Sequence, residues 1–179
     1  MNPQTTGLEA GDLGAEPEHA EIGTAKQAAA DDRVLVFGRL LGAANRLEHI
    51  LGREIEAECG ISHLMFEVLL ILGRAGEPGL PMRRIAQEQV LTTGGATRLV
   101  DRMVRAGLVE RVAEPGDRRV HLVRLTEAGE RTAVTAARLH ARNVQRYLLD
   151  ALPADERELF AAQVKLIGHA ARDALPPLG

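Results

Sequence analysis

The order of short segments between residues 82 and 125 constrains the fold more than any other feature of the chain. Residues 82–89, with Ile85 and Ala86 facing inward, and residues 93–106 have the apolar spacing of two short helices, and Val-Leu-Thr-Thr forms the turn between them. Residues 108–112 and 120–125 resemble two strands, and the Pro-Gly in AEPGDRR marks the turn that joins them. Two short helices followed by a hairpin with a basic tip predict a winged helix-turn-helix.

Longer helical patterns lie on both sides of this module. Residues 31–58 place apolar side chains near helical spacing, and residues 61–74 continue with a second apolar-periodic helix. After the hairpin, residues 126–152 and 155–174 predict two more helices, separated by Pro153. The flanking helices are too long to bury their apolar stripes within the module. We therefore predict a mainly α fold with a small β-hairpin wing.

Composition favours one domain with an aliphatic, helical core. The 179 residues include no Trp and only 2% aromatic residues, while Ala and Leu are abundant. No apolar run reaches the roughly 18 residues of a membrane span, and the acidic N-terminus lacks the features of a signal peptide. We expect a cytoplasmic protein with no membrane partner.

Charge is distributed unevenly along the chain. Residues 1–32 hold seven acidic residues and one Lys, whereas residues 81–131 hold ten Arg against seven acidic residues. Residues 1–28 also lack an apolar period, which predicts a disordered acidic tail ahead of a domain at 29–179. Binding to a polyanion would be confined to the basic segment.

The second short helix begins with side chains suited to reading DNA. Thr92 or Thr93 is a good N-cap, and hydroxyls of both, with that of Thr97, could contact phosphates or base edges. Arg98 could reach a guanine or a phosphate. Gly94 and Gly95 would let the backbone N–H groups approach a phosphate or the groove floor. A frayed helix start without any partner is the alternative.

The tip of the hairpin adds a cluster of charges: Asp117, Arg118 and Arg119. A solvated charge cluster is the ordinary explanation, but here it follows a helix-turn-helix in the basic segment of the chain. Arginine at such a tip can enter a narrow minor groove. Arg102 could pair with Asp117 and brace the wing, which would leave Arg119 to bind DNA.

Residues 80–130 resemble the winged-helix core of the MarR (multiple antibiotic resistance regulator) family. The resemblance is carried by TRLVDRM in the second helix, AGLVERV before the wing and DRRVHLVRLTEAG after it. With the long helices, it extends over roughly residues 31–175.

This resemblance implies a transcription regulator, most simply a repressor, that binds a pseudo-palindrome in double-stranded DNA as a homodimer. Residues 31–58 and 126–175 would form the dimer, and residues 61–125 would be the DNA-binding lobe. Asp117 would brace Arg102, and Arg119 would enter the minor groove. A ligand cleft between the dimer helices and each lobe would bind a small-molecule effector that releases the DNA.

Other candidate sites have simpler alternatives. Cys59 could sense peroxide, but a buried or incidental thiol is the simpler interpretation. His63 and Glu67, at i and i+4, could bind a metal or an anionic effector with help from His49, or could form only a hydrogen-bonded pair.

Catalytic chemistry lacks support in the sequence. A nucleophile elbow, a His-Glu-x-x-His motif and a Gly-rich phosphate loop are all missing. We therefore expect no enzyme activity, no catalytic residue, no cofactor and no metal site. A helical adaptor that has lost DNA binding would predict a neutral lobe, which the basic segment argues against.

Overall fold

The computed structural model describes residues 21–114 and 117–176, and it describes the backbone alone for residues 117–120. Contacts divide the chain into two units, residues 1–42 and 43–179. Residues 1–20 of the predicted tail lie outside the described part. In the first unit, helix α1 (Ala25–Ala30) forms where the tail was expected to continue, because the Thr24 side chain accepts a hydrogen bond from the backbone N–H of Gln27.

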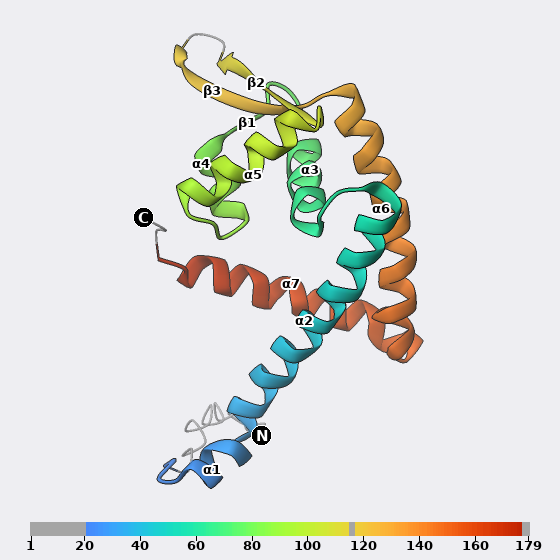
Figure 1. Cartoon of the computed structure of the whole chain (residues 1–179). Helices are drawn as coiled ribbons and strands as arrows, with labels where there is room; N and C mark the ends of the chain where they lie inside the picture. Colours follow the sequence, from blue (N-terminus) through green and yellow to red (C-terminus); the bar gives the residue numbers. More distant parts are fainter. Residues whose placement is uncertain (1–20, 115–116, 177–179) are drawn as a thin grey trace, which may run out of the picture. The chain divides into compact units, whose positions relative to one another are not determined.

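Helices make up most of the described chain (Figure 1). Helix α2 runs through the boundary between the two units, and the second unit adds five helices and three strands. The helices are α2 (Asp32–Cys59), α3 (His63–Ala75), α4 (Met82–Glu88), α5 (Thr93–Arg105), α6 (Glu127–Tyr147) and α7 (Arg157–Ala174). The strands are β1 (Leu80–Pro81), β2 (Val109–Glu114) and β3 (Asp117–Leu125). The fold is the predicted winged helix-turn-helix with long flanking helices.

The helix predicted to reach residue 152 ends earlier. Helix α6 stops at Tyr147, and two short 3-10 turns, Leu149–Ala151 and Ala154–Glu156, lead into α7. Apolar periodicity continues through such turns, so it does not reveal where α-helical hydrogen bonding stops.

A third strand completes the sheet, which has the order β1-β3-β2 with antiparallel neighbours. The sequence predicts Leu80 as an extended link, and here Leu80 pairs with Val123. Gly79 makes this pairing possible, because it has φ +105° and a Cβ there would clash with the carbonyl oxygen of Val123. The edge strand is only two residues long, which is too short for period-two alternation to be visible in the sequence.

The core of the lobe lies between the helices and the sheet, and it is aliphatic apart from Phe66. Its largest fully buried side chains come from α2, α3, α4, α5 and both longer strands: Phe66, Ile55, Leu69, Ile85, Leu99, Met103, Val68, Val100, Val109 and Val123. Ile85 and Ala86 face inward as predicted. This core fixes one face of α5 and leaves the other face to solvent.

Apolar side chains on two long helices remain uncovered. On α7, Leu166 is 70% exposed and Leu159 60% exposed, and no side chain of this helix is buried among the described residues. On α2, Phe37 is 64% exposed. Even so, within the described ranges, every helix is too short or too polar to cross a lipid bilayer.

Candidate nucleic-acid interface

Helix α5 has a well-defined beginning. Thr92 is the N-cap residue, and its Oγ1 accepts a hydrogen bond of 3.2 Å from the Gly95 N–H. Thr97 Oγ1 donates to the carbonyl of Thr93 at 2.9 Å. The Thr92 hydroxyl therefore retains its proton for an outside acceptor, whereas the Thr97 hydroxyl retains lone pairs.

Helix α5 also has a well-defined C-terminal end. Gly107 has φ +70°, its N–H donates to the carbonyl of Val104, and the Leu108 N–H donates to that of Met103. These two bonds form a Schellman motif, in which Gly107 ends the helix. With its inner face in the core and both ends capped, α5 presents its outer face in one orientation.

The outer face of α5 is basic. Arg98, Arg102 and Arg105 are exposed, and with Gly95 and Asp101 they line an open concavity. Arg98 and Arg102 were expected at this surface, but Arg105 was not. Its spacing of i+7 from Arg98 and i+3 from Arg102 was the available signal, because such positions share one helix face.

Neither glycine at the start of α5 is required by the backbone. Both lie in the helix, and neither is among the glycines with positive φ. A Cβ at Gly94 would meet nothing within 4 Å, and one at Gly95 would lie 3.3 Å from Thr92 Oγ1. A tight turn therefore does not account for Gly94, whereas the close approach of an external partner would.

The wing follows α5 directly, but the side chains of Asp117, Arg118 and Arg119 lie outside the described part of the structure. The pairing of Arg102 with Asp117 stays a prediction. A different ion pair ties the wing to α5, in which Arg111 Nη2 on β2 donates to Asp101 Oδ1 at 2.6 Å. The two side chains come from separate elements, so no local sequence pattern predicts this contact.

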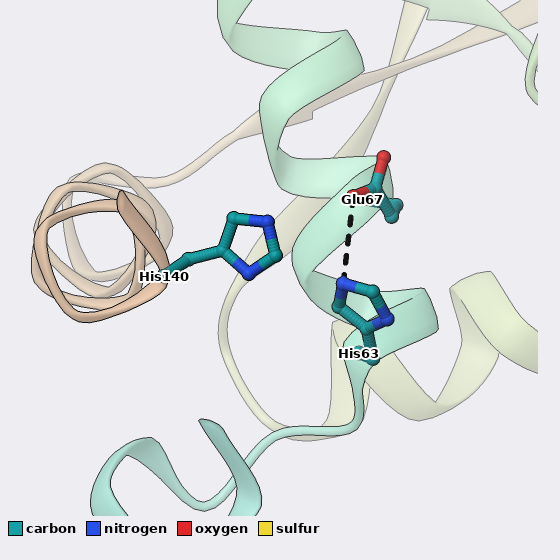
Figure 2. Close-up of side chains that lie close together, drawn as sticks. All are labelled: His63, Glu67 and His140. Atoms are coloured by element: carbon teal, nitrogen blue, oxygen red, sulfur yellow. Dashed lines mark ion pairs between the residues drawn. The ribbon is translucent and has the colours of Figure 1, made fainter. Parts of the chain in front are cut away.

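His63 and Glu67 lie together on α3, with His63 Nε2 3.7 Å from Glu67 Oε1 (Figure 2). The other ring nitrogen of His63 faces Glu48 Oε1 on α2 at 3.7 Å. His140 on α6 completes the group, with ring centroids 5.3 Å from His63. His49 does not join it, because His49 is exposed and lines a separate pocket on α2. Successive residues of a helix point about 100° apart, so Glu48 on α2 faces α3 whereas the next residue, His49, does not.

Cys59 lies at the end of α2 and is partly buried. Burial, together with the negative charge of Glu58, raises the pKa of the Cys59 thiol. A sensing thiol requires the opposite shift. The environment of Cys59 therefore favours the simpler interpretation of an unreactive thiol.

Comparison with known proteins gives consistent results. Residues 60–120 match the model of the MarR family. Multiple antibiotic resistance protein MarR of Escherichia coli is 29% identical over 127 residues, which cover 70% of this chain and 85% of that protein. HTH-type transcriptional regulator MhqR of Bacillus subtilis is 28% identical over 113 residues, 63% of this chain and 76% of that protein.

The fold agrees as well. The crystal structure of Sco3205, a MarR family transcriptional regulator from Streptomyces coelicolor in complex with DNA, superposes with a TM-score of 0.69. It is 23% identical and covers 79% of this chain and 88% of that one. With its winged helix and its capped, basic α5, the chain is similar to the MarR family of transcription regulators.

Proposed function

We propose that this protein represses transcription by binding a pseudo-palindromic operator as a homodimer and that a small-molecule effector releases it. The outer face of α5 is the observation that carries the proposal. Three exposed arginines and a first turn without bulky side chains lie on a helix whose other face is buried in the core. A helix held in this way can enter the major groove, where arginine recognises guanine or a phosphate.

Dimerisation is supported by the uncovered apolar side chains of α2 and α7. A helix whose apolar residues stay as exposed as Leu159 and Leu166 gains little from folding alone. A second copy of the chain, bound through these helices, would cover them. Two lobes related by a two-fold axis would then contact major grooves about 10 base pairs apart.

An effector could bind beside the DNA-binding lobe. A cavity of about 420 Å³ is lined by α4 and α7, a size within the range of small-molecule sites. It combines charged groups, Arg84, Glu88 and Arg172, with apolar ones, Val90 and Leu175. Residues His63 and Glu67, near α6, are the second candidate. An effector would release DNA only if it binds more tightly to a dimer whose lobe spacing differs from the spacing that fits the operator.

Operator binding tests the proposal. The full chain is titrated into a labelled duplex from the intergenic region next to its own gene, with fluorescence anisotropy as the readout. We expect Arg98→Ala and Arg119→Ala each to weaken binding by about 1–3 kcal/mol. Arg138→Ala, an exposed arginine on α6, is the control and should bind normally. Normal affinity in both lobe variants would refute the assignment of this surface.

A further inference from the structure

Three potential metal ligands meet between α3 and α6. His63 and Glu67 come from α3 and His140 from α6, and one ligand atom from each lies within 4.8 Å of the other two. Figure 2 shows the two rings and the carboxylate turned toward one another. All three side chains are partly buried, so the group lies beside the core rather than on an open surface.

Two nitrogens in this group lack hydrogen-bond partners. His63 Nε2 and His140 Nδ1 are both buried, and neither is hydrogen-bonded to any residue that the structure describes. A buried polar atom without a partner destabilises the folded state. The 3.7 Å between His63 Nε2 and Glu67 Oε1 is too long for a hydrogen bond. It is close to the separation of about 3.4 Å between two ligands of a tetrahedral zinc ion with bonds near 2.05 Å.

The charges around the histidines favour a cation. Glu67 lies on one side of His63, and Glu48 Oε1 lies 3.7 Å from His63 Nδ1 on the other. Two carboxylates would repel an anionic effector. In contrast, a carboxylate beside the second nitrogen of a histidine is the usual partner of a metal-binding ring, because it leaves the other nitrogen deprotonated toward the metal.

We propose that His63, Glu67 and His140 bind one divalent first-row transition metal ion, of which zinc is the best match. Two imidazoles and one carboxylate are a ligand set that zinc accepts, with the fourth position left to water. The site would join α3 in the DNA-binding lobe to α6. Sequence reasoning predicted no metal, because His140 lies 73 positions after Glu67 in the chain and no short motif connects them.

A metal ion binds imidazole and carboxylate ligands only in their deprotonated forms. Metal affinity should fall as the pH drops and the ligands take up protons.

Metal titration of the full chain, without a polyhistidine tag and after treatment with EDTA, tests the proposal. Zn²⁺ is titrated calorimetrically, and Co²⁺ is titrated while the visible absorption of a tetrahedral cobalt centre is recorded. We expect one ion per chain and a higher unfolding temperature with zinc, because a ligand that binds the folded state stabilises it.

Matched variants locate the site. His63→Gln, Glu67→Gln and His140→Gln should each lower the affinity for Zn²⁺ by more than about tenfold. His49→Gln removes an exposed histidine outside the group and should leave affinity unchanged. Circular dichroism in EDTA identifies any variant that fails to fold, and Glu67→Gln changes a side chain that is more exposed than that of His63. Lack of binding in the wild-type chain, or binding that persists in both Glu67→Gln and His140→Gln, would overturn the proposal.

Discussion

Glycines in this lobe occupy two different environments. Gly79 has a positive φ, and at Gly129 a Cβ would clash with the carbonyl oxygen of Leu108, so the fold requires glycine at both positions. Gly94 has a helical backbone and open space around it. No described residue requires glycine at this position, and the proposed DNA interface would give it a role.

Gly94→Ala tests this role. We expect this variant to be more stable by up to about 1 kcal/mol, because alanine loses less backbone entropy than glycine in a helix. Operator affinity should fall, since the new methyl group would stand between the helix and the DNA. Thermal unfolding and anisotropy titration measure the two effects. Gly129→Ala is the control and should lose stability. Unchanged operator affinity in Gly94→Ala would show that the glycine has no role in binding.

Histidine 140 should make stability depend on pH when metal is removed by EDTA. Its pKa is lowered in the folded state from a usual value of 6.5. As the pH falls through 6.5 toward the folded pKa, the unfolded chain binds the proton more readily, so stability decreases. Above 6.5 neither state is protonated, and the stabilisation is fully present. Urea unfolding between pH 5 and 8 measures this effect, which His140→Gln should reduce; an identical pH dependence in that variant would contradict it.

The start of α6 is hydrogen-bonded to the turn that follows α5. Thr126 caps α6 by accepting a hydrogen bond of 3.0 Å from the Gly129 N–H, and its hydroxyl donates to the Gly107 carbonyl at 2.6 Å. One side chain thus connects the start of α6 to the turn that ends α5. Gly129 lies close to Leu108 at the same junction, because a Cβ on Gly129 would clash with the Leu108 carbonyl oxygen.

Thr126→Ala should destabilise the fold by about 1–2 kcal/mol, because both hydrogen bonds of the cap are lost. Thr126→Ser keeps the hydroxyl and should restore most of the stability. Thr135→Ala is the matched control, since the exposed Thr135 hydroxyl donates only within its own helix, to the Arg131 carbonyl. Chemical denaturation measures all three. Equal losses in Thr126→Ala and Thr135→Ala would argue against a special role for the cap.

At the scale of the whole molecule, the uncovered apolar side chains of α2 and α7 are the dominant feature. These exposed side chains do not belong to the core of the lobe, whose buried residues come from other positions on α2, from α3 to α6 and from the sheet. These side chains are consistent with the proposed homodimer, which would also hold two lobes at a fixed spacing. Phosphate contacts from both lobes would make operator binding strongly salt-dependent.

Leu166→Glu tests the dimer. A charge at this exposed apolar position should turn the dimer into a monomer, because burying an unpaired carboxylate is costly. Operator affinity should also fall, because a monomer contacts only one half of the operator. Light scattering coupled to size-exclusion chromatography measures the mass, and Gln163→Glu, on the same helix, is the control for added charge. A dimer that persists in both Leu166→Glu and Phe37→Glu would exclude these helices as the interface.

Features that depend on neighbours along the chain could be predicted from the sequence. Helix α5 begins after Thr92 and ends before Gly107, as these residue types predict, because a cap involves only residues within one helical turn. The helix-turn-helix order and the resemblance of residues 80–130 to the MarR family followed from the same local patterns.

Contacts between residues far apart in the chain could not be predicted, because they depend on the tertiary fold. It paired β1 with β3, tied Asp101 to Arg111, and brought Glu48 and His140 to His63 in place of His49. These contacts depend on how helices and strands pack, and one residue of helical phase turns a side chain by about 100°. Periodicity identifies a helix from its sequence, but the packing of the core sets the direction in which each side chain points.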